Sequence, residues 1–287
     1  MKAPRFAYAR PSSVAETLAL LAQHKGDARV LAGGQSLVPM LNFRVAAPAV
    51  LVDINRVAGL SGIDVAKDRV RIGAMTRHTE IERSPAIARH LPLLAEAIAH
   101  VAHPAVRNRG TFGGSCALAD PAAELPACAL ALGGTFVVAG PRGERRVPAA
   151  EFFTGLYATA LDPRELLVAA EFPLPAPGAV SAFGELARRH GDYALVGVAA
   201  HALARGGALH DARVVFFGVG DKPVRAARIE RALEGRAADA RAIAGALEQL
   251  DADLAPRADL HASAPTKRHL AKVLAGRVLA RLPGAAA

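Results

Sequence analysis

The chain has 287 residues, of which 52% are hydrophobic, and this composition excludes a disordered or collagen-like protein. The length favours two domains. Lys and Arg number 35 against 26 Asp and Glu, which gives a net charge of +9. The basic residues form no long block, and aromatic residues do not alternate with them as a base-stacking surface requires. The charge therefore does not favour nucleic-acid binding.

The first residues contain no apolar segment typical of a secretory signal. The longest uncharged run, residues 125–140, is too short to span a membrane and is interrupted by Pro126 and by Gly133 and Gly134. We therefore expect a soluble, cytoplasmic protein with no membrane span.

Cys116 and Cys128 are the only cysteines, and their spacing matches no zinc or iron–sulfur motif. Two thiols cannot hold a four-thiolate cluster. We expect both to be buried thiols in a reducing compartment. His100 and His103 have no accompanying ligand cluster, which favours packing or hydrogen bonding, and no metal site is expected.

The first half of the chain predicts short helices and strands in alternation. Ser13 and Glu16 form a capping box at the start of a helix that Gly26 ends. Strands are expected at 29–31, 50–54, 70–72, 135–139 and 145–147, and helices at 80–89, 93–101 and 122–132. The glycine-rich segment 106–115 is expected to form a loop.

The second half of the chain begins after a cluster of Pro173, Pro175, Pro177 and Gly178, which predicts a boundary between domains 1–177 and 178–287. Strands at 183–189, 195–204 and 213–219 predict a three-stranded antiparallel sheet. Helices are expected at 228–233, 239–250 and 267–281. The fold class is α+β.

Two glycine pairs carry the functional prediction. They stand in Ala32-Gly33-Gly34-Gln35-Ser36 and in Thr111-Phe112-Gly113-Gly114-Ser115. Glycine allows backbone N–H groups to approach a phosphate closely, and hydroxyl groups add side-chain donors. Either pair alone is more typical of a turn. Two such loops in one domain favour opposite walls of a pyrophosphate site.

The usual nucleotide-binding motifs are missing. The sequence contains neither G-x-G-x-x-G nor G-x-x-x-x-G-K-[ST], so a Rossmann fingerprint and a P-loop are both excluded. A dinucleotide has to be bound by another fold.

Three motifs resemble the FAD-binding medium subunit of molybdenum hydroxylases, the family of carbon monoxide dehydrogenase and xanthine dehydrogenase. The first runs from Ala32 to Leu37 with Pro39, and the second joins 106–115 to Ala119-Asp120-Pro121-Ala122-Ala123-Glu124-Leu125-Pro126. The third is Arg188-Arg189-His190-Gly191-Asp192-Tyr193-Ala194-Leu195-Val196. The motifs follow the family order, and the similarity covers nearly the whole chain.

The resemblance implies an N-terminal, PCMH-type FAD-binding domain of two α+β subdomains, followed by the C-terminal domain of carbon monoxide dehydrogenase flavoproteins. It implies that FAD accepts electrons from a small subunit with [2Fe–2S] clusters, beside a large molybdopterin subunit, in a dimer of heterotrimers. The electrons would pass on to a quinone or to NAD.

The resemblance also implies roles for individual residues. The two glycine loops would hold the FAD pyrophosphate, and Glu124 would bind the ADP ribose. Tyr193 would act at the flavin ring near N5, as the catalytic residue, with Asp192 orienting its loop through Arg188 or Arg189. The cofactor-binding residues are Ala32, Gly33, Gly34, Gln35, Ser36, Leu37, Val101, Thr111, Phe112, Gly113, Gly114, Ser115, Asp120, Glu124, Leu167, Asp192 and Tyr193.

Two positions depart from the family pattern: Phe112 replaces an aliphatic residue, and Gly184 stands where some relatives have a Lys near the flavin. Other interpretations stay open. Asp120, just before Pro121, could serve a helix N-terminus, and Tyr193 could be a buried aromatic residue. The chain could be a free-standing FAD-dependent oxidoreductase, although no catalytic base is identifiable, or a basic, non-enzymatic interaction module.

Overall fold

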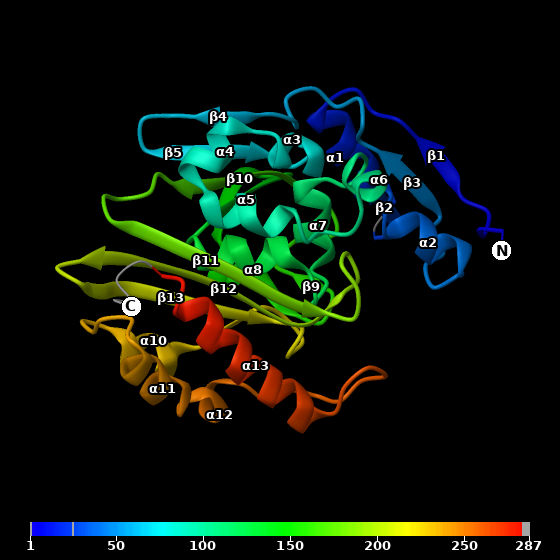
Figure 1. Cartoon of the computed structure of the whole chain (residues 1–287). Helices are drawn as coiled ribbons and strands as arrows, with labels where there is room; N and C mark the ends of the chain where they lie inside the picture. Colours follow the sequence, from blue (N-terminus) through cyan, green and yellow to red (C-terminus); the bar gives the residue numbers. More distant parts are fainter. Residues whose placement is uncertain (1, 25, 283–287) are drawn as a thin grey trace.

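The computed structural model describes residues 2–24 and 26–282, so the last five residues of the expected C-terminal domain lie outside the described residues. A three-stranded parallel sheet stands first, in the order β1 (Ala7–Ala9), β3 (Val50–Asp53) and β2 (Ala28–Leu31). Helices α1 (Val14–Gln23) and α2 (Leu37–Asn42) connect its strands (Figure 1). Ser13 caps α1 through a hydrogen bond of 3.1 Å from the N–H of Glu16, as predicted. The reciprocal half of the capping box differs, because the Glu16 carboxylate accepts from the N–H of Ser12 at 2.7 Å.

A five-stranded antiparallel sheet follows. Its order is β4 (Ile63–Val65), β5 (Arg69–Gly73), β10 (Leu166–Pro173), β6 (Thr135–Gly140) and β7 (Gly143–Pro148). The central strand β10 was not expected from the sequence. Its residues 166–170 are all buried, so the strand lacks the alternation that identifies a half-exposed strand.

The segment between β5 and β6 is helical, and it corrects two predictions. The helix expected at 80–89 is two helices, α3 (His78–Glu82) and α4 (Pro85–His90), because Ser84 caps a new helix that has Pro85 at its first position. The loop expected at 106–115 ends α6 (Pro104–Arg107) and begins α7 (Phe112–Leu118). Helices α5 (Pro92–Ile98) and α8 (Glu124–Ala131) lie close to their expected positions.

The last third of the chain forms an antiparallel sheet in the order β11 (Ala179–Ala187), β12 (Ala194–Arg205), β13 (Ala208–Phe217) and β14 (Val224–Arg225). The first three strands are those predicted, and β14 is a short addition. Helices α10 (Ala227–Leu233), α11 (Ala240–Leu247), α12 (Leu250–Asp253) and α13 (Ala264–Leu279) cover one face. The other elements are α9 (Ala149–Phe152), β8 (Phe153–Gly155) and β9 (Ala158–Thr159).

Helices α5 and α8 lie between the five-stranded sheet and the C-terminal sheet (Figure 1). Phe183, Val215 and Phe217 of the C-terminal sheet therefore share one hydrophobic core with α8 and with the five-stranded sheet. The two halves of the chain are also joined by hydrogen bonds. The N–H of Gly218 donates to the carbonyl of Pro121 at 2.8 Å, and Nζ of Lys222 donates to the carbonyl of Phe153 at 3.0 Å.

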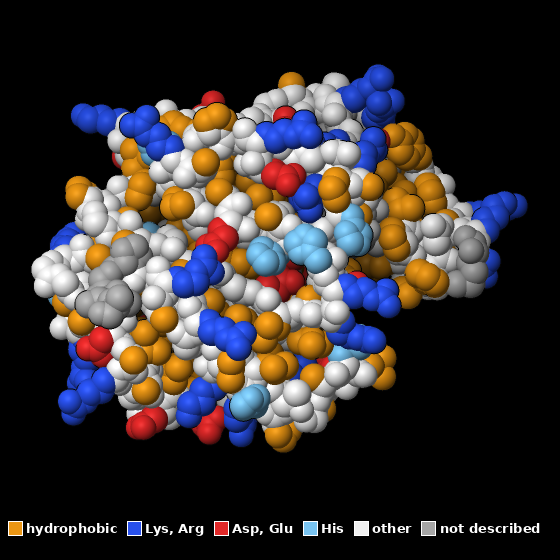
Figure 2. All heavy atoms as spheres, viewed as in Figure 1, with side chains coloured by type: hydrophobic (Ala, Val, Ile, Leu, Met, Phe, Trp, Pro, Cys, Tyr) orange, Lys and Arg blue, Asp and Glu red, His pale blue; other side chains and the backbone are white. Residues whose placement is uncertain are grey.

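Within the described residues, no helix is both long and apolar enough to cross a membrane. Cys116 and Cys128 are free thiols and fully buried. Basic and acidic side chains are interspersed over the face that Figure 2 shows, and the basic ones do not gather into one patch.

Candidate functional site

A cavity of about 830 Å³ lies between the parallel sheet, the N-terminal part of α7 and the loop before β12. Sixteen of the seventeen predicted cofactor-binding residues line it. They are Ala32, Gly33, Gly34, Gln35, Ser36, Leu37, Val101, Thr111, Gly113, Gly114, Ser115, Asp120, Glu124, Leu167, Asp192 and Tyr193. The exception is Phe112, whose ring is 1% exposed and lies edge-on to Phe172 in the core. Residues from four separate stretches of sequence therefore meet at one place.

The first glycine loop offers unused hydrogen-bond donors to the cavity. Among the described residues, the N–H groups of 33–36 find no acceptor within the protein. Gly34 adopts a φ of +74°, which a side chain would strain, and thereby turns the chain from β2 into α2. Buried or half-buried N–H groups without partners are rare in proteins, so this loop is suited to bind an anion.

The second glycine loop differs from the prediction, because its backbone N–H groups are already used. Those of Phe112 and Gly113 donate to the carbonyls of Thr76 and Ala74 at 3.0 and 2.8 Å. That of Gly114 donates to Oγ1 of Thr111 at 3.1 Å, which makes Thr111 the N-cap of α7. This wall therefore offers hydroxyl groups and a surface without side chains, and not a nest of free amides.

The two glycine loops touch each other. A Cβ atom on Gly33 would overlap the carbonyl of Arg109 and would lie 2.9 Å from Cα of Gly110. Only glycine therefore fits at position 33 without displacing the neighbouring loop. A Cβ atom on Gly114 would lie 3.7 Å from Cβ of Ala32. Glycine at these positions brings the two walls together, in addition to leaving room for a ligand.

A network of polar side chains, which the sequence analysis did not predict, connects the two loops through hydrogen bonds. Arg77 donates to the carbonyl of Arg109 and, at 2.6 Å, to Oδ1 of Asn55. Asn55 in turn donates to the carbonyl of Ala32 at 2.9 Å and to Asp53 at 2.6 Å. Tyr8 of β1 donates to the other oxygen of Asp53. The network joins residues as far apart in the sequence as Tyr8 and Arg109, which are separated by 101 positions, so no local motif connects them.

His78 also lines the cavity without having been predicted. Its side chain packs against Gly110, where a Cβ atom would lie 2.8 Å from Nδ1. Burial lowers the pKa of His78 to about 4, with smaller effects from neighbouring groups, so the ring is neutral at pH 7. Neither ring nitrogen has a hydrogen-bond partner among the described residues.

One end of the cavity is acidic and aromatic. The hydroxyl of Tyr157 donates to Oδ2 of Asp120 at 3.2 Å. Burial, and then the charge of Asp120, raises the pKa of Glu124 to about 7. Loss of water contacts, and then the charges of Asp120 and Glu124, raises the pKa of Tyr193. Tyr193 is nevertheless 72% exposed, so this end opens to the surface.

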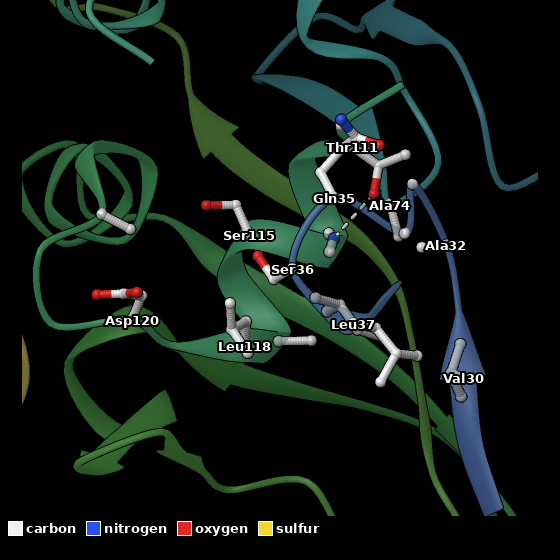
Figure 3. A pocket seen from close by; sticks show the side chains of 18 of the residues that line it. Val30, Ala32, Gln35, Ser36, Leu37, Ala74, Thr111, Ser115, Leu118 and Asp120 are labelled. Carbon is white, nitrogen blue, oxygen red and sulfur yellow. Dashed lines mark hydrogen bonds between the residues drawn. The ribbon is translucent and has the colours of Figure 1, made fainter. Parts of the chain in front are cut away.

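The opposite end of the cavity is lined mainly by apolar side chains, with Arg29 beside Val30. Ser36 and Ser115 lie in the middle, with Asp120 toward one end and Val30 toward the other (Figure 3). Leu21, Met40 and Ile54 also line the cavity. Glu124 and Tyr193 interact electrostatically, so both lie toward the acidic end. The roles expected of Glu124 at the ADP ribose and of Tyr193 at the flavin ring stay predictions.

Two further expectations change. Gly184 does not face the cavity, because a Cβ atom there would lie 2.6 Å from Val278 of α13. Asp192 is held by its backbone N–H, which donates to the carbonyl of Arg189 at 3.1 Å. Within residues 2–24 and 26–282, no ion pair joins its carboxylate to Arg188 or Arg189, and no group of His, Cys, Asp and Glu is arranged to hold a metal ion.

Two families match the chain. The FAD binding domain in molybdopterin dehydrogenase matches residues 4–175, and the CO dehydrogenase flavoprotein C-terminal domain matches residues 181–282. The chain is 41% identical to the alpha subunit of the 6-hydroxypseudooxynicotine dehydrogenase complex of Paenarthrobacter nicotinovorans, over 98% of this chain and 95% of that one.

Solved structures agree with these matches. Carbon monoxide dehydrogenase from Hydrogenophaga pseudoflava superposes with a TM-score of 0.95 at 41% identity, over 97% of each chain. Quinoline 2-oxidoreductase from Pseudomonas putida 86 gives a TM-score of 0.92 at 42% identity, also over 97% of each chain. A carbon monoxide dehydrogenase medium chain and a putative xanthine dehydrogenase FAD-binding subunit are 40% and 31% identical. The chain therefore carries an FAD-binding domain and belongs to the family of FAD-binding medium subunits of carbon monoxide and xanthine dehydrogenases, which are parts of oxidoreductase complexes.

Proposed function

We propose that this chain binds FAD in the 830 Å³ cavity and transfers electrons for a molybdenum hydroxylase. The observation that carries the proposal is the row of free N–H groups at 33–36, opposite the hydroxyl of Ser115. A pyrophosphate is an anion that needs such donors, whereas a glycine turn without a ligand would leave them unsatisfied. The residues present therefore fit the cofactor.

The cavity suggests how FAD is oriented. With the pyrophosphate in the middle, the apolar end near Val30 suits the adenosine, and the open end near Tyr193 suits the flavin ring. Glu124 then serves the flavin end. This orientation puts the redox-active ring where Tyr193 is 72% exposed and a partner subunit can approach. FAD supplies the electron transfer, while the chain binds and orients it.

The complex that we propose contains a large molybdopterin subunit and a small subunit with [2Fe–2S] clusters, in a cytoplasmic dimer of heterotrimers. Electrons enter from the nearer cluster and leave for a quinone or for NAD. Family membership over nearly the whole chain supports this arrangement, as do the two free, buried thiols, which leave the clusters to a partner.

The experiment that tests the function has two steps. The chain is purified alone, titrated with FAD and desalted, and we expect about one flavin to be retained per chain. It is then co-expressed with the candidate partner subunits, and flavin reduction is followed after the addition of substrate. Absence of retained flavin would refute the cofactor assignment. Retained flavin that partner subunits never reduce would refute the electron-transfer role.

A further inference from the structure

The first glycine loop separates two cavities. Residues 32–35 line the 830 Å³ cavity and also a second cavity of about 380 Å³ on the other side of the loop. Asp53, Asn55 and Arg109 line the second cavity and not the first. A loop with space on both sides can move toward either one unless a contact holds it. The position of this loop therefore depends on the hydrogen bonds that it makes on the side of the second cavity.

The side-chain amide of Asn55 supplies this contact, and its neighbours determine its orientation. Nδ2 donates to the carbonyl of Ala32 at 2.9 Å and to Oδ1 of Asp53 at 2.6 Å. Oδ1 accepts a hydrogen bond of 2.6 Å from the guanidinium of Arg77. A guanidinium can only donate, whereas a carbonyl and an ionised carboxylate can only accept. The opposite orientation of the amide would therefore lose all three hydrogen bonds.

Asp53 maintains this orientation because it is ionised. It is largely buried, and burial alone would raise its pKa, but hydrogen bonds from Tyr8 and Asn55 lower the pKa below its usual value. The hydroxyl of Tyr8 donates to Oδ2, and the backbone N–H of Asn55 donates to Oδ1 at 2.9 Å. Tyr8 is 54% exposed on β1. A continuous series of hydrogen bonds thus connects the protein surface with the first glycine loop.

The bond to the carbonyl of Ala32 determines where the next N–H group points. The C=O and N–H groups of a trans peptide point in opposite directions, and the described residues contain no cis peptide. Because Asn55 holds the carbonyl of Ala32 on the side of the second cavity, the N–H of Gly33 points toward the 830 Å³ cavity. Arg77 also donates to the carbonyl of Arg109, just before the second glycine loop. One network therefore holds both walls of the site.

We propose that Asn55 is a positioning residue of the FAD site, which directs the N–H of Gly33 at the pyrophosphate and fixes the separation of the two glycine loops. The inference rests on the proposed function, which places the pyrophosphate beside residues 33–36. Asn55 acts through the loop and does not line the FAD cavity. Asp53 and Tyr8 fix its orientation, and Arg77 connects it to the second loop. A donor that is already directed binds an anion without the cost of ordering the loop.

The affinity of the full chain for FAD, measured by quenching of flavin fluorescence, tests this role. Asn55→Asp preserves the acceptor for Arg77 but removes the donor to Ala32. We expect it to weaken FAD binding about tenfold, as for the loss of one hydrogen bond. Asn108→Asp is the matched control, because Asn108 is exposed and the substitution adds the same charge next to Arg109. Its FAD affinity should stay within about twofold of that of the wild type.

Tyr8→Phe tests the surface end of the network without altering the glycine loop. Loss of one hydroxyl should weaken FAD binding about threefold, because Asp53 then orients Asn55 less firmly. The same substitution in an Asn55→Asp background should have no further effect, since both residues act through one contact. Effects that multiply in the double variant would overturn the role of Tyr8.

Phosphorus NMR of bound FAD gives a readout that a general loss of stability would not change. Asn55→Asp should shift the pyrophosphate resonances, whereas Asn108→Asp should leave them in place. An Asn55→Asp variant that is folded by circular dichroism and keeps the wild-type affinity and resonances would overturn the inference while leaving the proposed function intact. If Asn55→Asp does not fold, an unchanged FAD affinity in Tyr8→Phe would overturn it. A wild-type chain that retains no FAD would refute the proposed function and this inference together.

Discussion

One methyl group at Gly33 tests whether the contact between the two glycine loops shapes the FAD site. In Gly33→Ala, Cβ would overlap the carbonyl of Arg109 and lie 2.9 Å from Cα of Gly110, where ordinary contact begins at 3.4 Å. Both neighbours are backbone atoms that cannot rotate away. The loops therefore have to separate by at least about half an ångström, against the hydrogen bonds of Arg77 and Asn55.

The magnitude follows from the cost of overpacking, which is about 1–3 kcal/mol for an added methyl group in a well-packed site. Separation of the walls moves the free N–H groups of 33–36 away from Ser115, so we expect part of this cost in cofactor binding. A loss of about 1.4–2.8 kcal/mol weakens FAD binding about 10- to 100-fold. The assay is titration of the apoprotein with FAD, followed by flavin fluorescence, together with urea unfolding.

Gly207→Ala is the control that separates a loss of stability from a loss of FAD affinity. Gly207 lies in the turn between β12 and β13 with a φ of +79° and has no atom within 4 Å of an added Cβ. A left-handed alanine costs about 1–2 kcal/mol, so this variant should lose stability and keep its FAD affinity. A folded Gly33→Ala variant with the FAD affinity of the wild type would refute the reasoning.

Three further predictions concern single side chains. Thr111→Val removes the acceptor for the N–H of Gly114 and should cost about 1 kcal/mol in urea unfolding; Thr111→Ser should restore it, and failure to do so would contradict the capping role. Tyr193→Phe should leave FAD affinity within about twofold and change the rate of flavin reoxidation, and an unaltered rate would make its role at the ring untenable. Glu185 has a pKa raised from 4.5 to about 8, so the folded state binds more protons than the unfolded state and stability falls as pH rises through this window. The stability difference between Glu185→Gln and the wild type should therefore shift in favour of the variant by about 1–2 kcal/mol between pH 5 and pH 9, after allowance for solvent screening. A difference in urea midpoint between the two proteins that is the same at both pH values would argue against it.

The sequence predicted the residues of the site better than their chemistry. Sixteen of the predicted residues line one cavity, because the motifs are local and mark where the chain must pass close to a ligand. We expected the second glycine pair to offer free amide donors to the ligand. The carbonyls of Thr76 and Ala74 instead accept hydrogen bonds from the N–H groups of Phe112 and Gly113, and only the tertiary structure brings these carbonyls next to the loop. A local sequence pattern predicts the conformation of a loop, but it does not show whether the N–H groups of the loop already have hydrogen-bond acceptors within the protein.

Long-range features account for the rest. Strand β10 is buried along residues 166–170, so no periodicity distinguished it from other apolar segments. Arg77 and Asn55 act on both glycine loops through contacts across the sequence, which no spacing rule predicts. Gly184 shows the converse error, because its position in a motif suggested the flavin while the structure packs it against α13.

The bond from the N–H of Gly218 to the carbonyl of Pro121 has a consequence for how the protein is made. It fixes the segment between Asp120 and Glu124 from the residue that follows β13, and Nζ of Lys267 donates to the carbonyl of Gly218 in turn. Gly218 and Lys267 are synthesised after both glycine loops. The growing chain can therefore fold the two glycine loops before this bond forms, and the segment between Asp120 and Glu124 is fixed only after Gly218 and Lys267 have left the ribosome. Retention of the cofactor would then depend on folding of the C-terminal sheet.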